Sequence, residues 1–244
     1  MTLVMESPTC YMHPFKVAIL DPSTDPEGWN FEKWRKSFAD RLHLIPFFRW
    51  KFASAPFGIN HPMWVDDPHF NLDYHVRRVA CPAPGDHRAL CQFMSSVYAY
   101  QLDRSRPLWT LWVVEGLQDG KVALVSLVHH AYVDGVGAAW GLQQLYRPEP
   151  GWQPEEVPEW HARPWPSWGK RLWWGARDLP AVLIKNLPRV VNGVRQKIAL
   201  EKRLRDEGRE SPSAAMMQKT PINVLLSPGR TFVCNDMPLD DFKT

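Results

Sequence analysis

The chain has 244 residues, of which 45% are hydrophobic and 23% charged, and its formal net charge is +3 at pH 7. This length can form one large domain or two small ones, and so small a net charge does not indicate a nucleic-acid-binding protein. No apolar run approaches the ~20 residues needed to cross a bilayer. The four cysteines show no CxxC spacing, which favours a reduced, intracellular protein.

The first part of the chain alternates predicted strands and helices. Residues 12–20 have strand character, and in residues 29–42 the apolar side chains recur at spacings of three and four, which predicts an amphipathic helix. Prolines interrupt residues 46–64, where we expect irregular structure with one short strand. Residues 72–79 are predicted to be extended, and Asp86 is expected to cap a second helix.

A predicted β-hairpin leads to two adjacent histidines. Its strands are residues 109–114 and 122–128, and the Asp119-Gly120 pair between them is typical of a tight turn. His129 and His130 follow the second strand directly. A third helix is expected after them, with three apolar side chains: Trp140, Leu142 and Leu145.

The composition changes after residue 146. Residues 147–167 are rich in proline and tryptophan and have no helical or strand period, which indicates a linker. Residues 170–205 have helical character, and we expect breaks near Pro180 and Pro188. Basic side chains outnumber acidic ones there and are interspersed with Trp and Leu. Such a helix can lie in a membrane interface or pack on the rest of the protein, and the sequence leaves both interpretations open.

Three regions are therefore predicted along the chain. The first, residues 1–146, holds the histidine pair. The second, residues 147–217, contains the linker and the basic amphipathic helices, and the third, residues 218–244, begins new strand-like structure that the chain does not complete.

The histidine pair is a candidate catalytic site. A histidine at a strand end is more often a structural polar residue, and adjacent residues of a strand point to opposite sides, so at most one faces a given cleft. Asp134 can order the following loop through an ion pair with an arginine, and Gly135 permits a tight turn. An imidazole with a pKa of ~6.5 can then accept a proton near neutral pH. A metal site is disfavoured because no third ligand lies nearby at a recognised spacing, and a serine hydrolase lacks its GxSxG motif.

HHAYVDG, at residues 129–135, resembles the HHxxxDG motif of the CoA-dependent acyltransferase superfamily, which includes peptide-synthetase condensation domains. The segments MESPTCYMH, WVDDPHFNLDYHVRRVACPAPGD, LDRSRPLWTLWVVEGL and PLDD narrow the resemblance to the bacterial wax ester synthase/diacylglycerol acyltransferase family and argue against a condensation domain. The likeness runs from about Leu3 to Leu145 and resumes weakly around Thr220.

This resemblance implies an α/β fold: the N-terminal half of a two-lobed, chloramphenicol acetyltransferase-like structure with a mixed sheet, flanking helices and a helical linker. It implies transfer of a fatty acyl group from acyl-CoA, as substrate, to diacylglycerol or a long-chain alcohol. No cofactor, metal or nucleic-acid partner is expected, and substrate-binding residues are not assigned. The protein would be cytoplasmic, with peripheral association with the inner membrane or lipid bodies as a further expectation.

The resemblance also implies roles for individual residues. His130, the second histidine of the motif, would be the general base that deprotonates the acceptor hydroxyl, and the protonated ring would help the CoA thiolate leave. His129 would support that ring or shape the cleft, Asp134 would be structural, and Gly135 would serve the turn. Three residues match the family's PLW motif and would pack to position the hairpin: Pro107, Leu108 and Trp109.

The sequence departs from the family pattern in two respects. Family members are nearly twice as long, so we expect this chain to hold the first lobe, the connecting helices and the start of the second lobe. Residues 220–232, TPINVLLSPGRTF, keep Asn223 and Arg230 of a usual TPLNGPIGPHRRF but replace four of its residues with Val224, Leu225, Ser227 and Gly229. We therefore expect the chain alone to be inactive or feeble. It could be a truncated product, part of a split enzyme that needs a complementary C-terminal half, or a non-catalytic lipid- or partner-binding half.

Overall fold

The computed structural model describes residues 3, 6–59, 61–132, 135–146, 152, 154, 156–206, 227, 229–234, 238 and 240. The chain divides into two compact units. The one that we call the sheet unit comprises Met1–Phe52, Val65–Pro164 and Ser227–Thr244. The one that we call the helix unit comprises Ala53–Trp64 and Trp165–Leu226.

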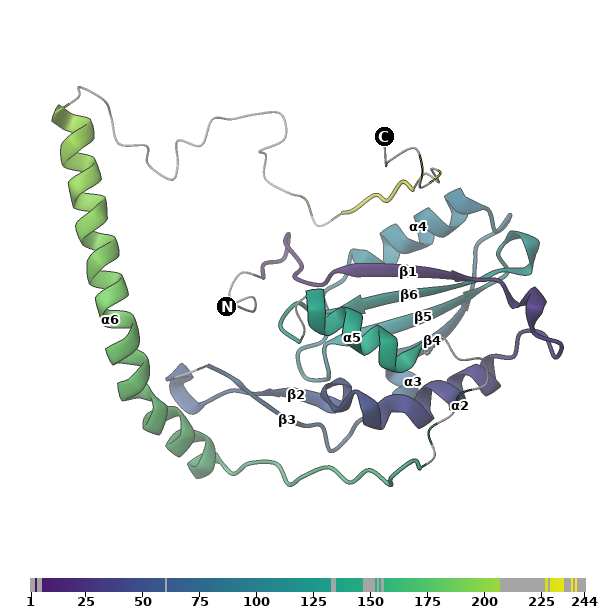
Figure 1. Cartoon of the computed structure of the whole chain (residues 1–244), viewed down its shortest axis with the longest axis horizontal. Helices are drawn as coiled ribbons and strands as arrows, with labels where there is room; N and C mark the ends of the chain where they lie inside the picture. Colours follow the sequence, from purple (N-terminus) through teal and green to yellow (C-terminus); the bar gives the residue numbers. More distant parts are fainter. Residues whose placement is uncertain are drawn as a thin grey trace. The chain divides into compact units, whose positions relative to one another are not determined.

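A four-stranded sheet forms the centre of the sheet unit (Figure 1). Its strand order is β1-β6-β5-β4, with bounds Phe15–Leu20 (β1), Val122–Val128 (β6), Trp109–Glu115 (β5) and Val76–Ala80 (β4). Strand β6 is antiparallel to both β1 and β5, whereas β4 is parallel to β5. The sheet is therefore mixed, as the sequence predicted, and the hairpin of β5 and β6 is confirmed.

Helices cover both faces of this sheet, because β6 is apolar at almost every position. Val122 and Leu124 belong to a core cluster that includes Phe38 of α2 (Phe31–Arg41) and Leu145 of α5 (Gly135–Leu145). The intervening positions belong to a second cluster with α4 (His87–Tyr98): Ala123, Val125 and Leu127. The alternation of side chains along a strand thus supplies two cores from one segment.

Side-chain hydrogen bonds and positive φ angles mark several element ends. The Asn30 side chain accepts a hydrogen bond from the backbone N–H of Lys33 at 2.9 Å at the start of α2. The Asp86 side chain accepts one from Ala89 N–H at 2.7 Å, which confirms the predicted cap of α4. Between β5 and β6, Asp119 and Gly120 both have positive φ, in the short turn Gln118–Gly120 (η5).

Two predictions for residues 46–79 were wrong. Residues 72–79 are not extended throughout, because a short helix α3 (Leu72–His75) precedes β4. The Asn71 side chain accepts a hydrogen bond from Asp73 N–H at 2.8 Å, and this bond starts a helical turn. Residues 46–64 hold two short strands rather than one, β2 (Trp50–Ala53) and β3 (Met63–Asp66), which pair with each other. A lone strand would leave its backbone groups without partners.

The helix unit is built around α6 (Trp168–Asp206), which runs through Pro180 and Pro188 without interruption. The predicted breaks were therefore wrong. A proline removes one N–H and bends a helix, but the turns on either side can continue. Near its start, Gly175 packs against Ile59 so closely that an added Cβ would lie 2.9 Å from the Ile59 side chain. No helix in the described part of the chain has the length and apolarity to cross a membrane.

The last part of the chain belongs to the sheet unit. Of residues 220–244, the structure describes 227, 229–234, 238 and 240, and none of these is in a strand. The strand-like structure predicted here is therefore not found in the described residues. Phe232 N–H donates instead to the Ser95 side chain on α4, at 2.9 Å. The three-region division predicted from the sequence remains a prediction.

Gly85, in the loop before α4, packs so closely against another part of the backbone that it leaves no room for a side chain. Its φ is +74°, and a Cβ there would clash with the backbone carbonyl of Gly116. Gly28 has a similar φ of +69° but has nothing within 4 Å of its Cβ position. A comparison of alanine substitutions at the two glycines therefore distinguishes the cost of a left-handed backbone from the cost of a steric clash.

We expect Gly85→Ala to lower the free energy of unfolding by roughly 3 kcal/mol or more, because backbone atoms must move to make room. Gly28→Ala should cost only about 1–2 kcal/mol, from its left-handed backbone. Urea unfolding followed by circular dichroism measures both variants. Equal losses would show that the close approach of Gly85 to Gly116 does not contribute.

His75 is a buried histidine in the core below β5. Its ring stacks on Trp109 with 4.5 Å between centroids, and its Nδ1–H donates to the Trp109 carbonyl at 2.7 Å. Burial, opposed in part by this hydrogen bond, lowers the pKa of His75 to about 4. The folded state therefore favours the neutral ring.

Unfolded chains bind this proton near the ordinary pKa of 6.5, so protonation of His75 favours unfolding as the pH falls from 6.5 to 4. Between these limits the single group changes stability by up to about 3 kcal/mol. We expect His75→Gln, which keeps a donor, to lose stability at pH 7 but to show a shallower decline from pH 6.5 to 4. Urea unfolding at several pH values measures this. The exposed His161 provides the control: an equal change of slope in His161→Gln would contradict the prediction.

Candidate functional site

The histidine pair lies in a turn that main-chain hydrogen bonds hold against the sheet unit. His129 N–H donates to the Leu108 carbonyl at 2.9 Å, and Tyr132 N–H closes the turn on the His129 carbonyl at 3.0 Å. His130 N–H donates to the Met12 carbonyl at 2.6 Å. The turn is thus tied to the residues that precede β1 and β5.

Tyr132 adds a side-chain support to this turn. Its hydroxyl accepts a hydrogen bond from Leu108 N–H at 2.9 Å and donates one to the Trp50 carbonyl. Burial raises the pKa of Tyr132 well above its usual value, so the hydroxyl stays protonated. Leu108 therefore contacts both ends of the turn through its own backbone.

The two histidines have opposite environments. The His129 side chain is completely buried, whereas His130 is exposed. The expectation that at most one of the two rings faces a given cleft stays a prediction. His130 is the ring that an external molecule can reach.

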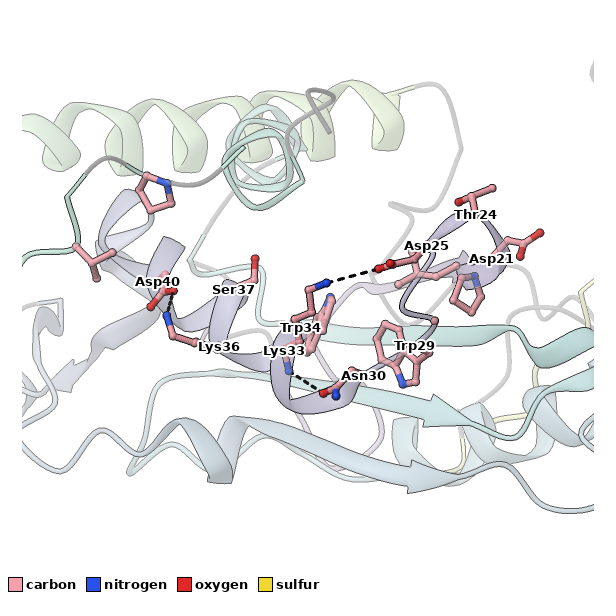
Figure 2. Close-up of a pocket in the computed structure, with 15 residues that line it drawn as sticks. Asp21, Thr24, Asp25, Trp29, Asn30, Lys33, Trp34, Lys36, Ser37 and Asp40 are labelled. Carbon is pink, nitrogen blue, oxygen red and sulfur yellow. Dashed lines mark hydrogen bonds and ion pairs between the residues drawn. The ribbon is translucent and has the colours of Figure 1, made fainter. Parts of the chain in front are cut away.

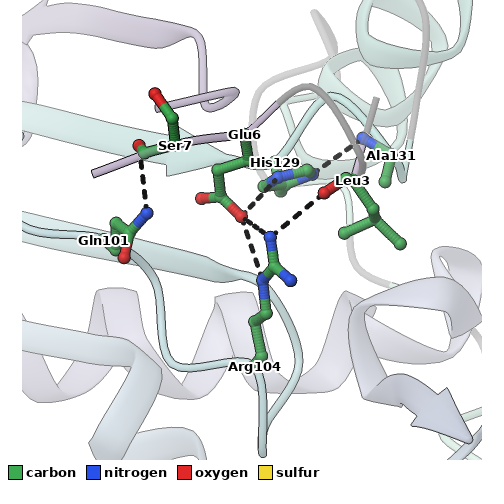
Figure 3. Close-up of polar contacts among 7 residues, drawn as sticks. All are labelled: Leu3, Glu6, Ser7, Gln101, Arg104, His129 and Ala131. Carbon is green, nitrogen blue, oxygen red and sulfur yellow. Dashed lines mark hydrogen bonds and ion pairs between the residues drawn. The ribbon is translucent and has the colours of Figure 1, made fainter. Parts of the chain in front are cut away.

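A buried carboxylate stands beside His129 (Figure 3). The Nε2 atom of His129 lies 3.7 Å from Oε2 of Glu6, whose side chain is 2% exposed. Arg104 forms an ion pair with the same carboxylate, with its Nε at 3.0 Å from Oε2, and also donates to the Leu3 carbonyl at 3.2 Å. Glu6 and Arg104 bring the N-terminal segment and the loop before β5 together at the histidine turn.

The hydrogen bonds of the His129 ring indicate its protonation state. Nδ1 accepts a hydrogen bond from Ala131 N–H at 3.0 Å, so this nitrogen carries no proton. The ring is then neutral with its proton on Nε2, the atom that faces Glu6. Burial lowers the pKa of His129, and the charge of Glu6 opposes this effect while Arg104 adds to it.

A second buried histidine, His13, lies nearby. Its ring stacks on Tyr11 with 5.4 Å between centroids and meets the edge of Tyr98 at 4.7 Å. Neither ring nitrogen has a hydrogen-bond partner among the described residues. Burial lowers the pKa of His13 to about 4, so this ring is neutral at physiological pH.

The PLW motif lies directly beneath the turn. Pro107, Leu108 and Trp109 are buried, and Trp109 Nε1–H donates to the Phe48 carbonyl at 2.7 Å. The backbone of Leu108 carries the contacts to His129 and Tyr132. The contact between this motif and the histidines is therefore made chiefly by main-chain atoms.

The structure says less about two of the predicted site residues. Asp134 lies outside the described residues, so its expected partner and role stay predictions. Gly135 is the first residue of α5. Sequence reasoning missed Glu6 and Arg104, although both fall inside segments that carried the family resemblance. A single carboxylate and a single arginine so far apart in the chain give no spacing signal.

A large pocket in the described part of the sheet unit lies elsewhere (Figure 2). It has a volume of about 720 Å³ and is lined mainly by α2 and the loop before it. Lys33 pairs with Glu27 at 2.8 Å, and Lys36 pairs with Asp40 at 2.7 Å. Neither histidine of the pair lines the pocket, and its charges are largely satisfied within the chain. We assign the candidate site to the histidine turn.

Comparisons with known proteins agree with the motifs. The family model of the wax ester synthase/diacylglycerol acyltransferase catalytic domain matches residues 1–244. A Mycobacterium tuberculosis protein named as a diacylglycerol O-acyltransferase is 43% identical over 99% of this chain, which covers 52% of that protein. The chain thus spans about half the length of this relative.

Two further matches complete the comparison. Another protein of M. tuberculosis named as a diacylglycerol O-acyltransferase, tgs3, is 30% identical over 89% of this chain and is itself covered to 82%. The solved wax ester synthase/diacylglycerol acyltransferase from Marinobacter aquaeolei VT8 is 30% identical, with a TM-score of 0.48, over 59% of this chain and 35% of that one.

The sequence resemblance was expected to weaken after Leu145, but the family model continues to the end of the chain. The mixed sheet with helices on both faces agrees with the predicted fold class. The chain therefore belongs to the wax ester synthase/diacylglycerol acyltransferase catalytic domain family.

Proposed function

We propose that this chain carries the catalytic histidine of an O-acyltransferase that moves a fatty acyl group from acyl-CoA to diacylglycerol or a long-chain alcohol. The observation that carries the proposal is the exposed ring of His130 on a turn pinned by main-chain hydrogen bonds, in a chain that belongs to this family throughout its length. A base held in this way can meet a bound hydroxyl without reorganisation of the backbone.

His130 would act as the general base. It takes the proton of the acceptor hydroxyl as that oxygen attacks the thioester carbonyl, and a tetrahedral intermediate forms. The intermediate then collapses, the C–S bond breaks, and the protonated ring gives its proton to the CoA sulfur. The products are an ester and free CoA, and no acyl-enzyme is needed. Such acid–base catalysis contributes roughly 10²- to 10⁴-fold.

His129 would act through His130 rather than on the substrate. Because its ring is buried and neutral, with Nδ1 bonded to Ala131 N–H and Nε2 facing Glu6, it fixes the turn that carries its neighbour. Glu6 and Arg104 would hold His129 in that tautomer. We propose Asp134 as a further structural residue of the turn.

The activity of the chain by itself is a separate proposal. The chain spans about half of its 43%-identical relative, so we propose that full activity needs a complementary second lobe. The relative tgs3 is covered to 82%, which supports the alternative that a chain of similar extent has a role of its own. That role would be catalysis or the binding of lipid or of a partner.

We expect His130→Ala to lower the release of CoA from acyl-CoA, in the presence of acceptor, by at least 100-fold while the chain stays folded. The assay is run on the chain alone and on the chain co-expressed with the second half of its 43%-identical relative. His161→Ala, another exposed histidine, should retain full activity.

Unchanged turnover in His130→Ala would refute the assignment of the base. Full turnover by the unmodified chain alone would refute the need for a second lobe. Binding of acyl-CoA without turnover in either preparation would favour the non-catalytic alternative. Circular dichroism spectra that match the parent's exclude loss of folding as the cause.

We also propose that α6 binds a membrane or lipid-body surface rich in anionic lipid. Large apolar side chains recur on it at spacings of three and four and are more than half exposed: Ile184, Leu187, Val190, Val194 and Ile198. Basic residues lie between them, and anionic lipid adds about 1 kcal/mol for each Lys or Arg near its surface. This combination of apolar and basic side chains on one helix supports the membrane interpretation.

We expect charge reversal of Lys185, Arg189 and Arg195 to glutamate to weaken binding to vesicles of phosphatidylglycerol and phosphatidylcholine at least tenfold, and added salt to weaken binding of the parent. Vesicle co-sedimentation measures both effects. A variant with the same net charge, Lys33, Lys36 and Arg88 to glutamate in the sheet unit, should bind within about threefold of the parent. Equal losses in the two variants, or no dependence on salt, would contradict the proposal.

A further inference from the structure

Three side chains that can bind a metal ion meet at the first turns of α4. His87, Cys91 and Cys234 each offer one ligand atom, and these atoms all lie within 4.8 Å of one another. Cys91 is buried, Cys234 is half-buried, and His87 is exposed. No disulfide joins the cysteines. This cluster belongs to the sheet unit and is separate from the histidine turn.

The helix presents two of the ligands on one face. His87 is the first residue of α4, and Cys91 follows four positions later, so the two side chains lie one above the other. The Asp86 side chain fixes this turn through its hydrogen bond to Ala89 N–H. A pair of ligands at positions i and i+4 of a helix is a recurrent arrangement in zinc sites.

The C-terminal segment supplies the third ligand in a matching register. Phe232 N–H donates to Ser95, which lies one helical turn after Cys91 on the same face. Two residues of extended chain cover about 6.6 Å, close to the roughly 6 Å between residues four apart in a helix. Cys234 therefore reaches the level of Cys91, and Figure 1 shows this segment running beside α4.

Packing holds the segment there independently of any metal. The Phe232 ring stacks on Phe15, with 4.9 Å between centroids, and meets the edge of Tyr98 at 5.3 Å. Arg230 donates to the Thr9 carbonyl. Cys234 is thus brought to α4 by contacts on both strand and helix.

We propose that His87, Cys91 and Cys234 bind one Zn²⁺ ion that fastens residues 230–234 to α4. Two thiolates and an imidazole are ligands that suit zinc, and three protein ligands leave a fourth position for water. With Zn–S bonds of about 2.3 Å, tetrahedral geometry separates two sulfurs by roughly 3.8 Å, so a shift of about 1 Å closes the site. Sequence reasoning did not find this site, because Cys234 is remote in the chain from the other two ligands.

The test is metal binding by the purified 244-residue chain, kept reduced and freed of metal with a chelator. Titration with Co²⁺ should produce the intense near-ultraviolet thiolate charge-transfer band and the visible bands of a tetrahedral site, and one equivalent of Zn²⁺ should remove them. Zn²⁺ should also raise the unfolding temperature. Cys91→Ala, Cys234→Ala and His87→Ala should each weaken Zn²⁺ binding at least tenfold.

Matched variants make the result specific. Cys81→Ala replaces another buried cysteine of the same core cluster, Cys10→Ala replaces a cysteine outside it, and His161→Ala replaces an exposed histidine. These should bind Zn²⁺ as the parent does, and Cys234→His, which supplies another ligand, should recover most of the affinity lost in Cys234→Ala. Circular dichroism verifies that each variant is folded.

Two outcomes would overturn the proposal. One is the absence of thiolate–Co²⁺ bands in the reduced parent, including the case in which Cys91 and Cys234 form a disulfide in air but take up no metal when reduced. The other is binding that the three ligand variants and the control variants weaken equally.

Discussion

The structure of the sheet unit depends on the burial of β6 on both faces. A strand in that position has no water on either side, so its backbone must be paired along both edges, and β1 and β5 provide those pairs. Successive side chains of β6 then pack alternately into two cores, one with α2 and α5 and the other with α4. The histidine turn follows from this arrangement, because it begins where the paired strand ends.

The charged pair of Glu6 and Arg104 lies next to the turn in this apolar setting. Glu6 is almost fully buried, and an isolated carboxylate there would be costly, so the pairing with Arg104 offsets part of the cost of its burial. Because Arg104 is about half exposed, the pair loses less hydration than a fully buried one would. The carboxylate also lies 3.7 Å from Nε2 of His129. The chain thus uses one desolvated charge to connect three segments that are distant in sequence.

The sequence predicted those features that depend on neighbours in the chain. The cap at Asp86, the turn at Asp119-Gly120 and the hairpin that ends at the histidines were all readable from local pattern. Features that depend on distant partners were not. Glu6 and Arg104 come together only when the chain folds. Asn71 starts a helical turn inside a segment whose apolar spacing suggested a strand. The two prolines of α6 led to the wrong prediction of helix breaks, because a proline inside a helix can bend it without ending it.

The contact between Leu108 and the histidine turn has a consequence for how such a site tolerates change. The N–H of Leu108 donates to the Tyr132 hydroxyl, and its carbonyl accepts from His129 N–H. The identity of the side chain at residue 108 therefore affects only packing. Alanine at residue 108 would leave these bonds intact and would therefore underestimate their importance. These bonds should instead slow hydrogen exchange at the amides of residues 108 and 129. The position of the His130 backbone is set by peptide groups, so side-chain substitutions at the residues that supply them change it only indirectly.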